Sequence, residues 1–565
     1  MNKIADLIEK NLKNLFAEVN TNNNKHDKNK HDKKKHDKNK HDKKKNCVDI
    51  KKRHKNVHCS PYNSCNPCNP CNPCNQCNQC NQCNQCNQCF PCPPSIPNDS
   101  IIYFNNYNNL INYKLPSRTS SYTNIITNIN NFSSLIDDSA LRGLNGTVYA
   151  IVADEKNGII YIGGDFTMAG NTSATYIVSY NISTGIFLPL IDDVTRNQGT
   201  DNQVLCLAFD SVNSKLYLGG DFTYVGGTIK ASRIASWDIS SSTFSPLTES
   251  GTNYEGADDS VRCLAIDSVN SILYFGGEIS RVASGTIITS YIAMWYINTS
   301  TFSPLTDSST MGQGVNSSIY SLTINSLSNI LYIGGAFTIV GENIEANCIA
   351  SWNNLTSKFS VLNDSETGIN GITGTNVAVY SLAFNPVNNS LYVGGSFDFA
   401  GGKMSQFISS YEITLSRWVN LEAGIQKIED TLKPIVNSLY LDVVNQILYT
   451  GGNYSQTSGI NTNNISVYDI NNKLWTPLVE NKGRYNGITN GIDYSNVNFI
   501  KSICKFNDLL FIGGEFNMGG NVPVNNITKV KLNYILNPNG SKIFINNTST
   551  ILKYNSTNNK WNIIY

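Results

Sequence analysis

The feature that most constrains this chain is an internal repeat marked by paired glycines. The pairs recur seven times, at spacings of 56, 57, 58, 60, 57 and 62 residues. They are Gly163, Gly164, Gly219, Gly220, Gly276, Gly277, Gly334, Gly335, Gly394, Gly395, Gly451, Gly452, Gly513 and Gly514. Leucine-rich repeats are about half this long or less, and helical solenoids need helix-length apolar stripes. The repeat therefore indicates one supersecondary unit of another kind, copied seven times.

Each repeat contains four short segments with strand character. The second copy shows them as VLCLAF at 204–209, KLYLGG at 215–220, RIASWDI at 233–239 and TFSPL at 243–247. The segments are rich in β-branched and aromatic residues and end at Gly, Asn, Asp or Ser, as strands do. Four antiparallel strands at this period predict an all-β fold, a single β-propeller with seven four-stranded blades. The paired glycines are expected where the chain approaches a neighbour too closely for a side chain.

The number of segments that match the fourth strand leaves the number of blades open. Eight segments match the fourth strand, at 132–135, 187–190, 244–247, 302–305, 359–362, 418–421, 475–478 and 561–564. Either the first copy closes a seven-bladed ring by pairing with the last blade, or residues 100–135 form a degenerate eighth blade. We favour seven because closure removes exposed sheet edges. ILKY at 551–554 and KWNII at 560–564 are expected to supply the last strands of the final blade.

The N-terminal residues divide into a helix and a basic tail. Residues 1–20 place apolar side chains three and four positions apart, which predicts a short amphipathic helix. Residues 21–60 repeat Lys, His and Asp without large apolar residues, so this low-complexity tail is expected to be disordered. Residues 1–60 hold 18 basic and 8 acidic residues; subtraction from the totals of 43 and 42 leaves 25 and 34 for the remainder. The tail is thus either a spacer or an arm that contacts polyanions weakly.

Residues 61–97 form a cysteine tract that precedes the propeller, which we assign to 98–565. Ten cysteines recur every third residue, at Cys65, Cys68, Cys71, Cys74, Cys77, Cys80, Cys83, Cys86, Cys89 and Cys92. A polyproline II conformation has three residues per turn and would align their sulfurs on one edge. They are candidate ligands for zinc or copper(I), candidate interchain disulfides, or a neutral repeat expansion. We favour cross-linking and self-association, because no second ligand pair is held by folded structure.

Particular repeats resemble known families. NNISVYDINNKLWTPL at 463–478, which follows LYTGG at 448–452, resembles a kelch repeat. IYIGGDFTMAG at 160–170 and LYLGGDFTYVGG at 216–227 are similar to the Gly-Gly-x-Phe-Thr repeats of fungal cortical polarity-marker proteins. The resemblance covers about residues 130–565 and implies a propeller. The membrane anchor and secretory signal of the polarity markers are not apparent here, so their surface location is not carried over.

Residue distribution argues against several kinds of enzyme. All six histidines lie at or before position 58, so the propeller has no histidine base, Ser-His pair or histidine-ligated metal. Asp165, Asp221, Glu278 and Glu515 follow Gly-Gly pairs and leave carboxylate-dependent glycan chemistry as a remote alternative. We expect these four to cap turns instead. Aromatic residues near the third strands are expected to pack between blades: Tyr180, Trp237, Trp295, Trp352, Tyr411 and Tyr468.

The leading hypothesis is a non-enzymatic scaffold that needs no cofactor. Loops at 192–203, 248–260 and 363–378 would present a surface to a protein or glycan, and the tail would tether or cross-link the module. The alternative is a structural component of a particle or wall, since the Asn- and Ile-rich composition suggests an AT-rich genome such as that of a large DNA virus. No apolar stretch is long enough to span a membrane, and no secretory leader is apparent. We therefore expect a cytoplasmic or virion location.

Overall fold

The computed structural model describes residues 101–102, 131–136, 141–426, 433–478, 487–489 and 499–532. It also describes the backbones of strands at 534–536, 542–544, 551–555 and 560–564. The predicted helix at 1–20, the basic tail at 21–60 and the cysteine tract at 61–97 lie outside these residues and stay predictions. Among the described residues, no helix is long and apolar enough to cross a membrane.

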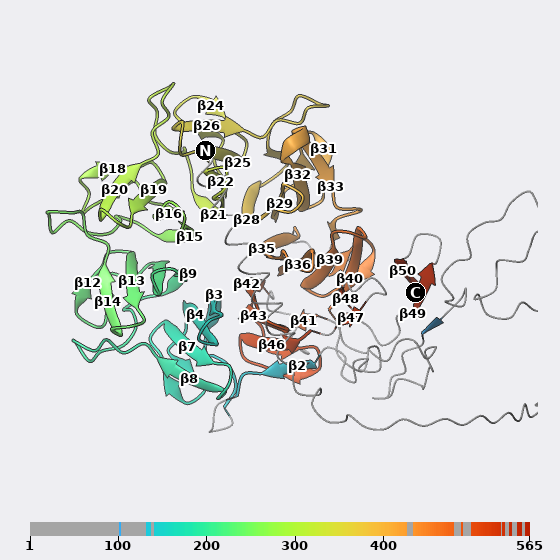
Figure 1. Ribbon diagram of the computed structural model, residues 1–565, viewed down its shortest axis with the longest axis horizontal. Helices are drawn as coiled ribbons and strands as arrows, with labels where there is room; N and C mark the ends of the chain where they lie inside the picture. Colours follow the sequence, from blue (N-terminus) through green and yellow to red (C-terminus); the bar gives the residue numbers. More distant parts are fainter. Residues whose placement is uncertain are drawn as a thin grey trace, which may run out of the picture. The chain divides into compact units, whose positions relative to one another are not determined.

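Seven four-stranded antiparallel sheets, the blades, form the body of the protein (Figure 1). From the innermost strand outward, blade 1 is β3 (Thr147–Asp154), β4 (Ile159–Asp165), β7 (Ile177–Asn181) and β8 (Ile186–Pro189). Blade 2 is β9 (Val204–Asp210), β10 (Lys215–Gly220), β13 (Ile234–Asp238) and β14 (Thr243–Pro246). Blade 3 is β15 (Val261–Asp267), β16 (Ile272–Gly277), β19 (Ile292–Tyr296) and β20 (Thr301–Pro304).

The remaining blades repeat this order. Blade 4 is β21 (Ile319–Asn325), β22 (Ile330–Gly335), β25 (Ile349–Asn353) and β26 (Lys358–Val361). Blade 5 is β28 (Ala378–Asn385), β29 (Ser390–Ser396), β32 (Ile408–Glu412) and β33 (Arg417–Asn420), with the 3-10 helix η2 (Ile413–Leu415) before β33. Blade 6 is β35 (Ile435–Asp442), β36 (Ile447–Asn453), β39 (Ile465–Asp469) and β40 (Leu474–Pro477). Blade 7 is β42 (Phe499–Phe506), β43 (Leu509–Glu515), β46 (Ile527–Lys531) and β2 (Asn131–Ser134).

Blade 7 is closed by a strand from the other end of the propeller sequence. β2 pairs antiparallel with β46, with Phe132 opposite Val530. The innermost strands of successive blades contact each other, and β42 contacts β3, so the ring is complete. The Thr528 hydroxyl donates to the Ser133 carbonyl at 3.0 Å, and the Ser134 hydroxyl donates to the Pro523 carbonyl at 2.6 Å. The prediction of seven blades closed by the N-terminal segment is confirmed.

The expected role of the C-terminal segments is wrong. β49 (Ile551–Asn555) and β50 (Lys560–Ile564) pair with each other and with β1 (Ile101–Ile102) in a separate three-stranded sheet. β47 (Tyr534–Leu536) and β48 (Lys542–Phe544) form a further hairpin. The physical reason is that β2 already pairs with the outer edge of β46, which is the position that ILKY or KWNII would have taken.

The two ends of the blades form two different faces. The turns between first and second strands, and between third and fourth strands, lie at one end, which we call the turn face. The linkers between blades and the loops between second and third strands lie at the other end, the linker face. Short hairpins decorate the linker face. They are β5 (Met168–Ala169) with β6 (Thr172–Ser173), β11 (Tyr224–Val225) with β12 (Ile229–Lys230), β17 (Arg281–Val282) with β18 (Ile287–Ile288), and β23 (Ile339–Val340) with β24 (Ile344–Glu345).

Three further hairpins gain an extra strand. β30 (Phe399–Ala400) and β31 (Lys403–Met404) pair with β27 (Ile372–Thr373). β37 (Gln456–Thr457) and β38 (Ile460–Asn461) pair with β34 (Ile425–Gln426). β44 (Met518–Gly519) and β45 (Val522–Pro523) pair with β41 (Ile488–Thr489). In each case the added strand comes from the preceding inter-blade segment, so the linker and the hairpin form one unit.

The paired glycines sit where adjacent blades touch, near the linker-face end of each second strand. A Cβ on the first glycine of any pair would lie no more than 3.1 Å from a Val or Ile on the innermost strand of the next blade. At Gly163 the obstacle is Val204, and at Gly513 it is Val148 across the seam. A Cβ on Gly164 would instead meet the Thr147 carbonyl of the same blade. The expected close approach is confirmed.

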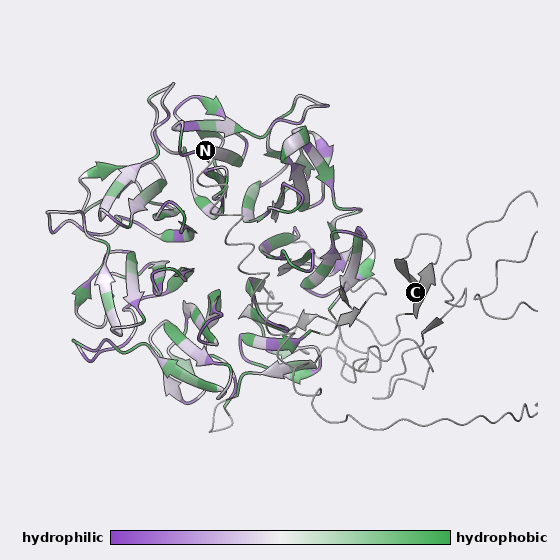
Figure 2. Cartoon of the chain, viewed as in Figure 1, coloured by the Kyte–Doolittle hydropathy of each residue, from purple (hydrophilic) through white to green (hydrophobic). Residues whose placement is uncertain are grey.

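The third-strand aromatic residues are packing residues, as predicted. All six are at least 93% buried, and each faces an aromatic residue of the fourth strand in register. Trp237 and Phe244, for example, have ring centroids 4.6 Å apart. The hydrophobic clusters that contain these pairs include residues of the neighbouring blade. Figure 2 shows the hydrophobic residues concentrated in the strands of the blades.

A small residue links successive innermost strands. The Ser321 hydroxyl accepts the Leu382 N–H at 3.0 Å, and the Ser502 hydroxyl accepts the Ile151 N–H at 3.0 Å across the seam. Cys206 occupies the same position in blade 2 and donates its S–H to the Val261 carbonyl at 3.4 Å. Cys206 therefore serves as a small buried polar residue. Cys206, Cys263, Cys348 and Cys504 are all free thiols.

Candidate functional site: the linker face

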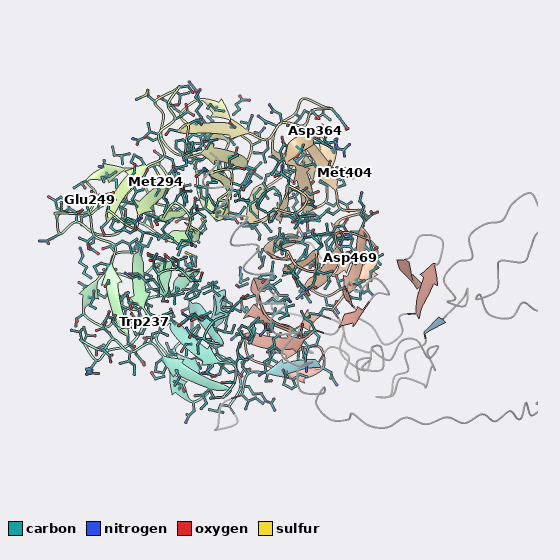
Figure 3. The ribbon with its side chains drawn as sticks, viewed as in Figure 1. Trp237, Glu249, Met294, Asp364, Met404 and Asp469 are labelled. Carbon is teal, nitrogen blue, oxygen red and sulfur yellow. The ribbon has the colours of Figure 1, made fainter. Side chains whose placement is uncertain are left out.

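Carboxylates fix the inter-blade linkers to the next blade. Asp192, Glu249, Asp307 and Asp364 occupy the same position in four successive linkers, and each accepts the backbone N–H of an aromatic residue on the outermost strand of the following blade at 2.7–2.8 Å. All but Glu249 are completely buried. Figure 3 labels Glu249 and Asp364 in two of these linkers. A linker held this way presents its outer residues in a fixed arrangement.

Hydrogen bonds favour the ionised form of Asp307 and Asp364. Burial raises the pKa of Asp307, but donation from the Ser309 hydroxyl and from the backbone N–H groups of Phe359, Thr310 and Ser309 outweighs burial and lowers it to about 2. Burial likewise raises the pKa of Asp364, whereas the Lys403 ammonium, 2.8 Å away, and three backbone N–H groups lower it to about 2. The negative charges are therefore part of the fold.

A second side chain in several linkers holds the adjacent hairpin. The Asp201 carboxylate accepts the N–H groups of Thr223 and Tyr224 at 2.8 and 2.9 Å. Asp258 binds Ser280 and Arg281 in the same way in the next linker, and Asn316 and Asn145 repeat the arrangement elsewhere. Each of these linkers is therefore tied to the blade that follows it. The loops predicted at 192–203, 248–260 and 363–378 all lie on this face.

Exposed apolar side chains lie on the hairpins and linkers of blades 2 to 5 on this face. Tyr224, Ile288, Phe399 and Met404 lie on the hairpins, and Met311 lies in the linker from blade 3 to blade 4. Met311 is 72% exposed and Met404, labelled in Figure 3, is 62% exposed. Large exposed apolar residues on a rigid surface are typical of contact sites for other molecules.

A hollow of about 400 Å³ opens beside Met311. Apolar and polar side chains share its lining, namely Met311, Val315, Ile339, Gln313, Asn316 and Glu342. Asn316 is already engaged, because its amide nitrogen donates to the Thr338 hydroxyl and its oxygen accepts from Thr338 and Ile339. The hollow is therefore built on a fixed floor with an apolar side, which suits a protruding side chain of a partner.

At the linker-face end of the innermost strands, each blade carries a β-bulge. The extra residues are Tyr149, Leu205, Arg262, Tyr320, Tyr380, Asn437 and Lys501. All seven are partly exposed. The rings of Tyr320 and Tyr380, from adjacent blades, have centroids 5.1 Å apart. Because bulges redirect side chains out of the sheet ladder, these residues give the axial end of the ring a mixed aromatic and charged character.

Charged side chains from several blades lie within electrostatic range of one another at this end of the ring. Burial raises the pKa of Tyr149, and Asp165, Glu515 and Asp221, which belong to blades 1, 7 and 2, raise it further. Burial lowers the pKa of Lys501, against the opposing effect of Glu515. The axial end therefore holds carboxylates and cationic groups from neighbouring blades within range of one another.

The four carboxylates that follow Gly-Gly pairs do not share one role. Asp221 accepts the Gln203 amide at 2.5 Å and a short hydrogen bond from the Ser260 hydroxyl of the next blade. Glu278 pairs with Arg262, with 3.0 Å between its Oε1 and a guanidinium nitrogen. Asp165 and Glu515 are exposed. Asp221 and Glu278 were expected to cap turns. They instead contact residues at the linker-face ends of innermost strands, because each lies beside the first strand of its own blade.

The predicted cysteine chemistry is not addressed by these residues. Cys65 through Cys92 lie outside the described residues. In the part of the chain that is described, no group of three or more His, Cys, Asp or Glu side chains is placed to hold a metal ion. Burial raises the pKa of the Cys348 thiol to about 11 and that of Cys504 to about 12. These buried thiols are consequently poor nucleophiles at neutral pH.

Sequence reasoning missed the bulge residues and the linker carboxylates. The bulges carry a signal, because each first strand contains a β-branched residue, a variable residue and a small one: VYA, VLC, VRC, IYS, VYS, VNS and IKS. The linker carboxylates also recur, two residues after the leucine that ends the fourth-strand motif, in LID, LTE, LTD and LND. Both patterns are visible only when the repeats are aligned at positions other than the glycines.

Closed pairing of seven four-stranded antiparallel blades defines a β-propeller. No protein-family model matches the chain. Polarized growth protein RAX2 of Candida albicans (strain SC5314 / ATCC MYA-2876) is 27% identical over 171 residues, which are 28% of this chain and 12% of that protein's length. The expected resemblance to fungal polarity proteins is thus present as a distant match over a small part of the relative.

Solved structures with a similar chain path include propellers of low sequence identity. "Structure of U3-55K" aligns with a TM-score of 0.44 and 13% identity over 71% of this chain and 98% of that chain. "Crystal structure of RRP9 WD40 repeats" aligns with a TM-score of 0.43 and 12% identity over 71% and 99%. The strand pairing by itself establishes the propeller fold.

Proposed function

We propose that this protein is a non-enzymatic propeller scaffold that binds a protein or glycan through its linker face. The observation that carries the proposal is the combination of fixed linkers and exposed apolar side chains. Asp192, Asp307 and Asp364 hold the linkers from inside, while Met311 and Met404 project outside. A surface that is already ordered loses little conformational entropy when it binds.

The axial end of this face would add specificity to the contact. Tyr320 and Tyr380, in blades 4 and 5, offer adjacent aromatic rings; on the other side of the ring, Tyr149 lies within electrostatic range of the exposed Asp165 and Glu515. Aromatic surfaces with charged neighbours suit a polypeptide with basic side chains or a sugar ring. We favour a protein partner, because the apolar residues extend outward from the axis onto the hairpins.

The non-enzymatic assignment is supported by side-chain chemistry. The propeller sequence has no histidine, and Asp221 and Glu278 are engaged by Gln203, Ser260 and Arg262. A carboxylate-dependent reaction on a glycan needs a pair of carboxyl groups directed at the same bond. We retain it as the least favoured alternative.

The tail would tether or cross-link the scaffold. β2 begins on the turn face, the end of the blades opposite the linker face. Disulfides among Cys65 to Cys92 would join chains under oxidising conditions, and weak polyanion contact would come from residues 21–60.

The kelch-like repeats and the likeness to polarity proteins agree with an interaction role. A structural component of a viral particle or wall is the second candidate, supported by the Cys tract and the composition of the chain. We propose a cytoplasmic or virion location for either role. Laddering on a non-reducing gel that disappears with reductant would support cross-linking through the Cys tract, which the structural component requires, whereas a soluble monomer in both conditions would favour the scaffold.

Affinity capture with the full chain tests the linker-face proposal. We expect wild-type protein to retain a partner that a Met311→Asp, Met404→Asp, Tyr380→Ala variant loses. A matched control, Val212→Asp on the turn face, should retain it because that residue is equally exposed but lies at the other end of the blade. Equal capture by the linker-face variant and by wild type would refute the proposal.

A further inference from the structure

Five blades place an aliphatic residue at the same position of the turn between their first and second strands. These residues are Val212, Val269, Leu327, Val387 and Val444, in blades 2 to 6, and they are 67–91% exposed. We call this set the aliphatic arc. Two more exposed leucines, Leu355 and Leu415, lie in the outer turns of blades 4 and 5 on the same face.

Local chemistry does not call for these residues. Tight turns favour Gly, Asn, Asp, Ser and Pro, whereas an exposed β-branched residue gains nothing there. Blades 1 and 7 fold with polar turns, which contain Glu155 and Lys156 in blade 1 and Asn507 and Asp508 in blade 7. Exposed apolar residues scattered singly are ordinary, but the arc repeats one position through five consecutive blades.

The turns present the arc rigidly. In blade 2 the Asp210 carboxylate accepts the N–H groups of Val212 and Asn213 at 3.0 and 3.2 Å. Asp267 holds Val269 in the same way in blade 3, and Asn385 holds Val387 in blade 5. Because the backbone of each turn is fixed, the aliphatic side chain cannot fold back against its own blade.

Neighbouring turns also touch one another. The Asn270 amide of blade 3 donates to Asn329 of blade 4 at 2.7 Å, and the Asn385 amide of blade 5 donates to Gln446 of blade 6 at 2.9 Å. These contacts join residues within two or three positions of Val269, Leu327, Val387 and Val444. The turns of the arc are therefore linked directly at two of its four blade junctions.

We propose that the aliphatic arc is a self-association surface, on which a second copy of this chain packs turn face to turn face. A twofold axis through blade 4 places Leu327 against Leu327 of the second copy, blade 3 against blade 5, and blade 2 against blade 6. Every member of the arc then meets another aliphatic residue. A closed twofold contact of this kind uses one self-complementary patch.

Charge at the ends of the arc favours the same arrangement. The twofold axis through blade 4 brings blade 1 of one copy opposite blade 7 of the other. The blade 1 turn, which carries the exposed Glu155 and Lys156, then faces the blade 7 turn with the exposed Asp508, so that Lys156 can pair with Asp508 at two places in the dimer. The five turns of the arc contain no charged residue, so packing them together leaves no like charges opposed.

A lipid surface is a poorer match to these residues. Interfacial binding usually combines aromatic or leucine side chains with Lys or Arg that contact anionic headgroups. The five turns supply mainly valine and no basic residue. The proposal concerns the face opposite the linker face, so it stands or falls independently of the proposed function.

Sedimentation equilibrium of the full chain in excess reductant tests the proposal, because reductant removes any link through the Cys tract. We expect a mass near twice 62.3 kDa for wild type and near 62.3 kDa for a Val269→Asp, Leu327→Asp, Val387→Asp variant. Aspartate is favoured in turns, so this variant should fold. Its circular dichroism spectrum and melting temperature should match those of the wild type when both are measured at a concentration at which both are monomeric.

The matched control is Val194→Asp, Met311→Asp, Met404→Asp, whose residues are comparably exposed on the linker face and should leave the dimer intact. Wild-type protein that stays monomeric up to about 100 µM, or an arc variant that still dimerises, would overturn the proposal. Vesicles containing phosphatidylserine that float a monomeric wild type but not the arc variant would overturn it in favour of a membrane.

Discussion

The two faces of the propeller differ in how most of their buried carboxylates are used. On the linker face, Asp307 binds its own loop and also reaches the Phe359 N–H of the next blade, 52 positions along the chain. On the turn face, Asp210 binds only Val212 and Asn213, within three positions. Asp307 therefore joins two blades, and Asp210 shapes a local turn.

The turn face also has contacts between blades, namely Asp442 with Lys505 at 2.8 Å and the amide contacts of Asn270 and Asn385. Carboxylates that bridge blades are more frequent on the linker face, where four linkers carry them.

The largest effect should come from filling the space between blades at the linker-face end. A Cβ on Gly334 would lie 2.5 Å from Val379 Cγ1 in the next blade. We expect Gly334→Val to destabilise the protein by about 3 kcal/mol or more, because neither blade can move without disturbing its other neighbour. Ser211→Val, which adds the same side chain to an exposed position of the turn face, should change stability by less than about 0.5 kcal/mol. Thermal melting of both variants makes the comparison; equal melting temperatures would show that the interface tolerates a side chain.

A smaller effect is expected from the carboxylates themselves. Asp307→Ala removes four hydrogen bonds and leaves the buried Phe359 N–H without its acceptor, which should cost about 2–3 kcal/mol. Asp210→Ala frees turn N–H groups next to solvent, so about 1 kcal/mol is expected. Urea denaturation of the two variants compares the faces directly. A greater loss for Asp210→Ala would reverse our assignment of the linker face as the stronger joint.

Acid should weaken the linker-face joints gradually. The pKa of Asp307 and of Asp364 is about 2 in the folded protein, below the value of about 3.9 for an unfolded aspartate. Each carboxylate therefore stabilises the fold above about pH 4, and this contribution of about 2 kcal/mol is lost as the pH falls through the folded pKa near 2. Melting temperature measured between pH 7 and pH 2 should fall mainly below pH 4. In an Asp307→Asn, Asp364→Asn variant the decline should be shallower, and an identical decline would assign the acid sensitivity to other groups.

Sequence periodicity was sufficient for the strands, the seven blades and the role of the glycines. A Cβ at Gly163 or Gly513 would collide with the neighbouring blade, as predicted. Trp237 and Tyr180 are buried packing residues. Periodicity misassigned ILKY and KWNII, because a strand motif records what a segment can pair with and not which edge is still vacant. The candidate site was predicted only as three loops. The Tyr320–Tyr380 pair and the hollow beside Met311 were not foreseen, since each assembles residues from two blades.

By itself the sequence determined the elements that depend on neighbours along the chain: four strands per repeat, glycine at close approaches and a body without histidine. Tertiary structure alone decided which strand closes blade 7, which backbone N–H groups donate to the linker carboxylates, and which apolar residues stay exposed. The physical reason is that these outcomes depend on ring closure. Phe132 and Val530 become partners only when residues almost 400 positions apart are brought together, and no local pattern encodes that distance.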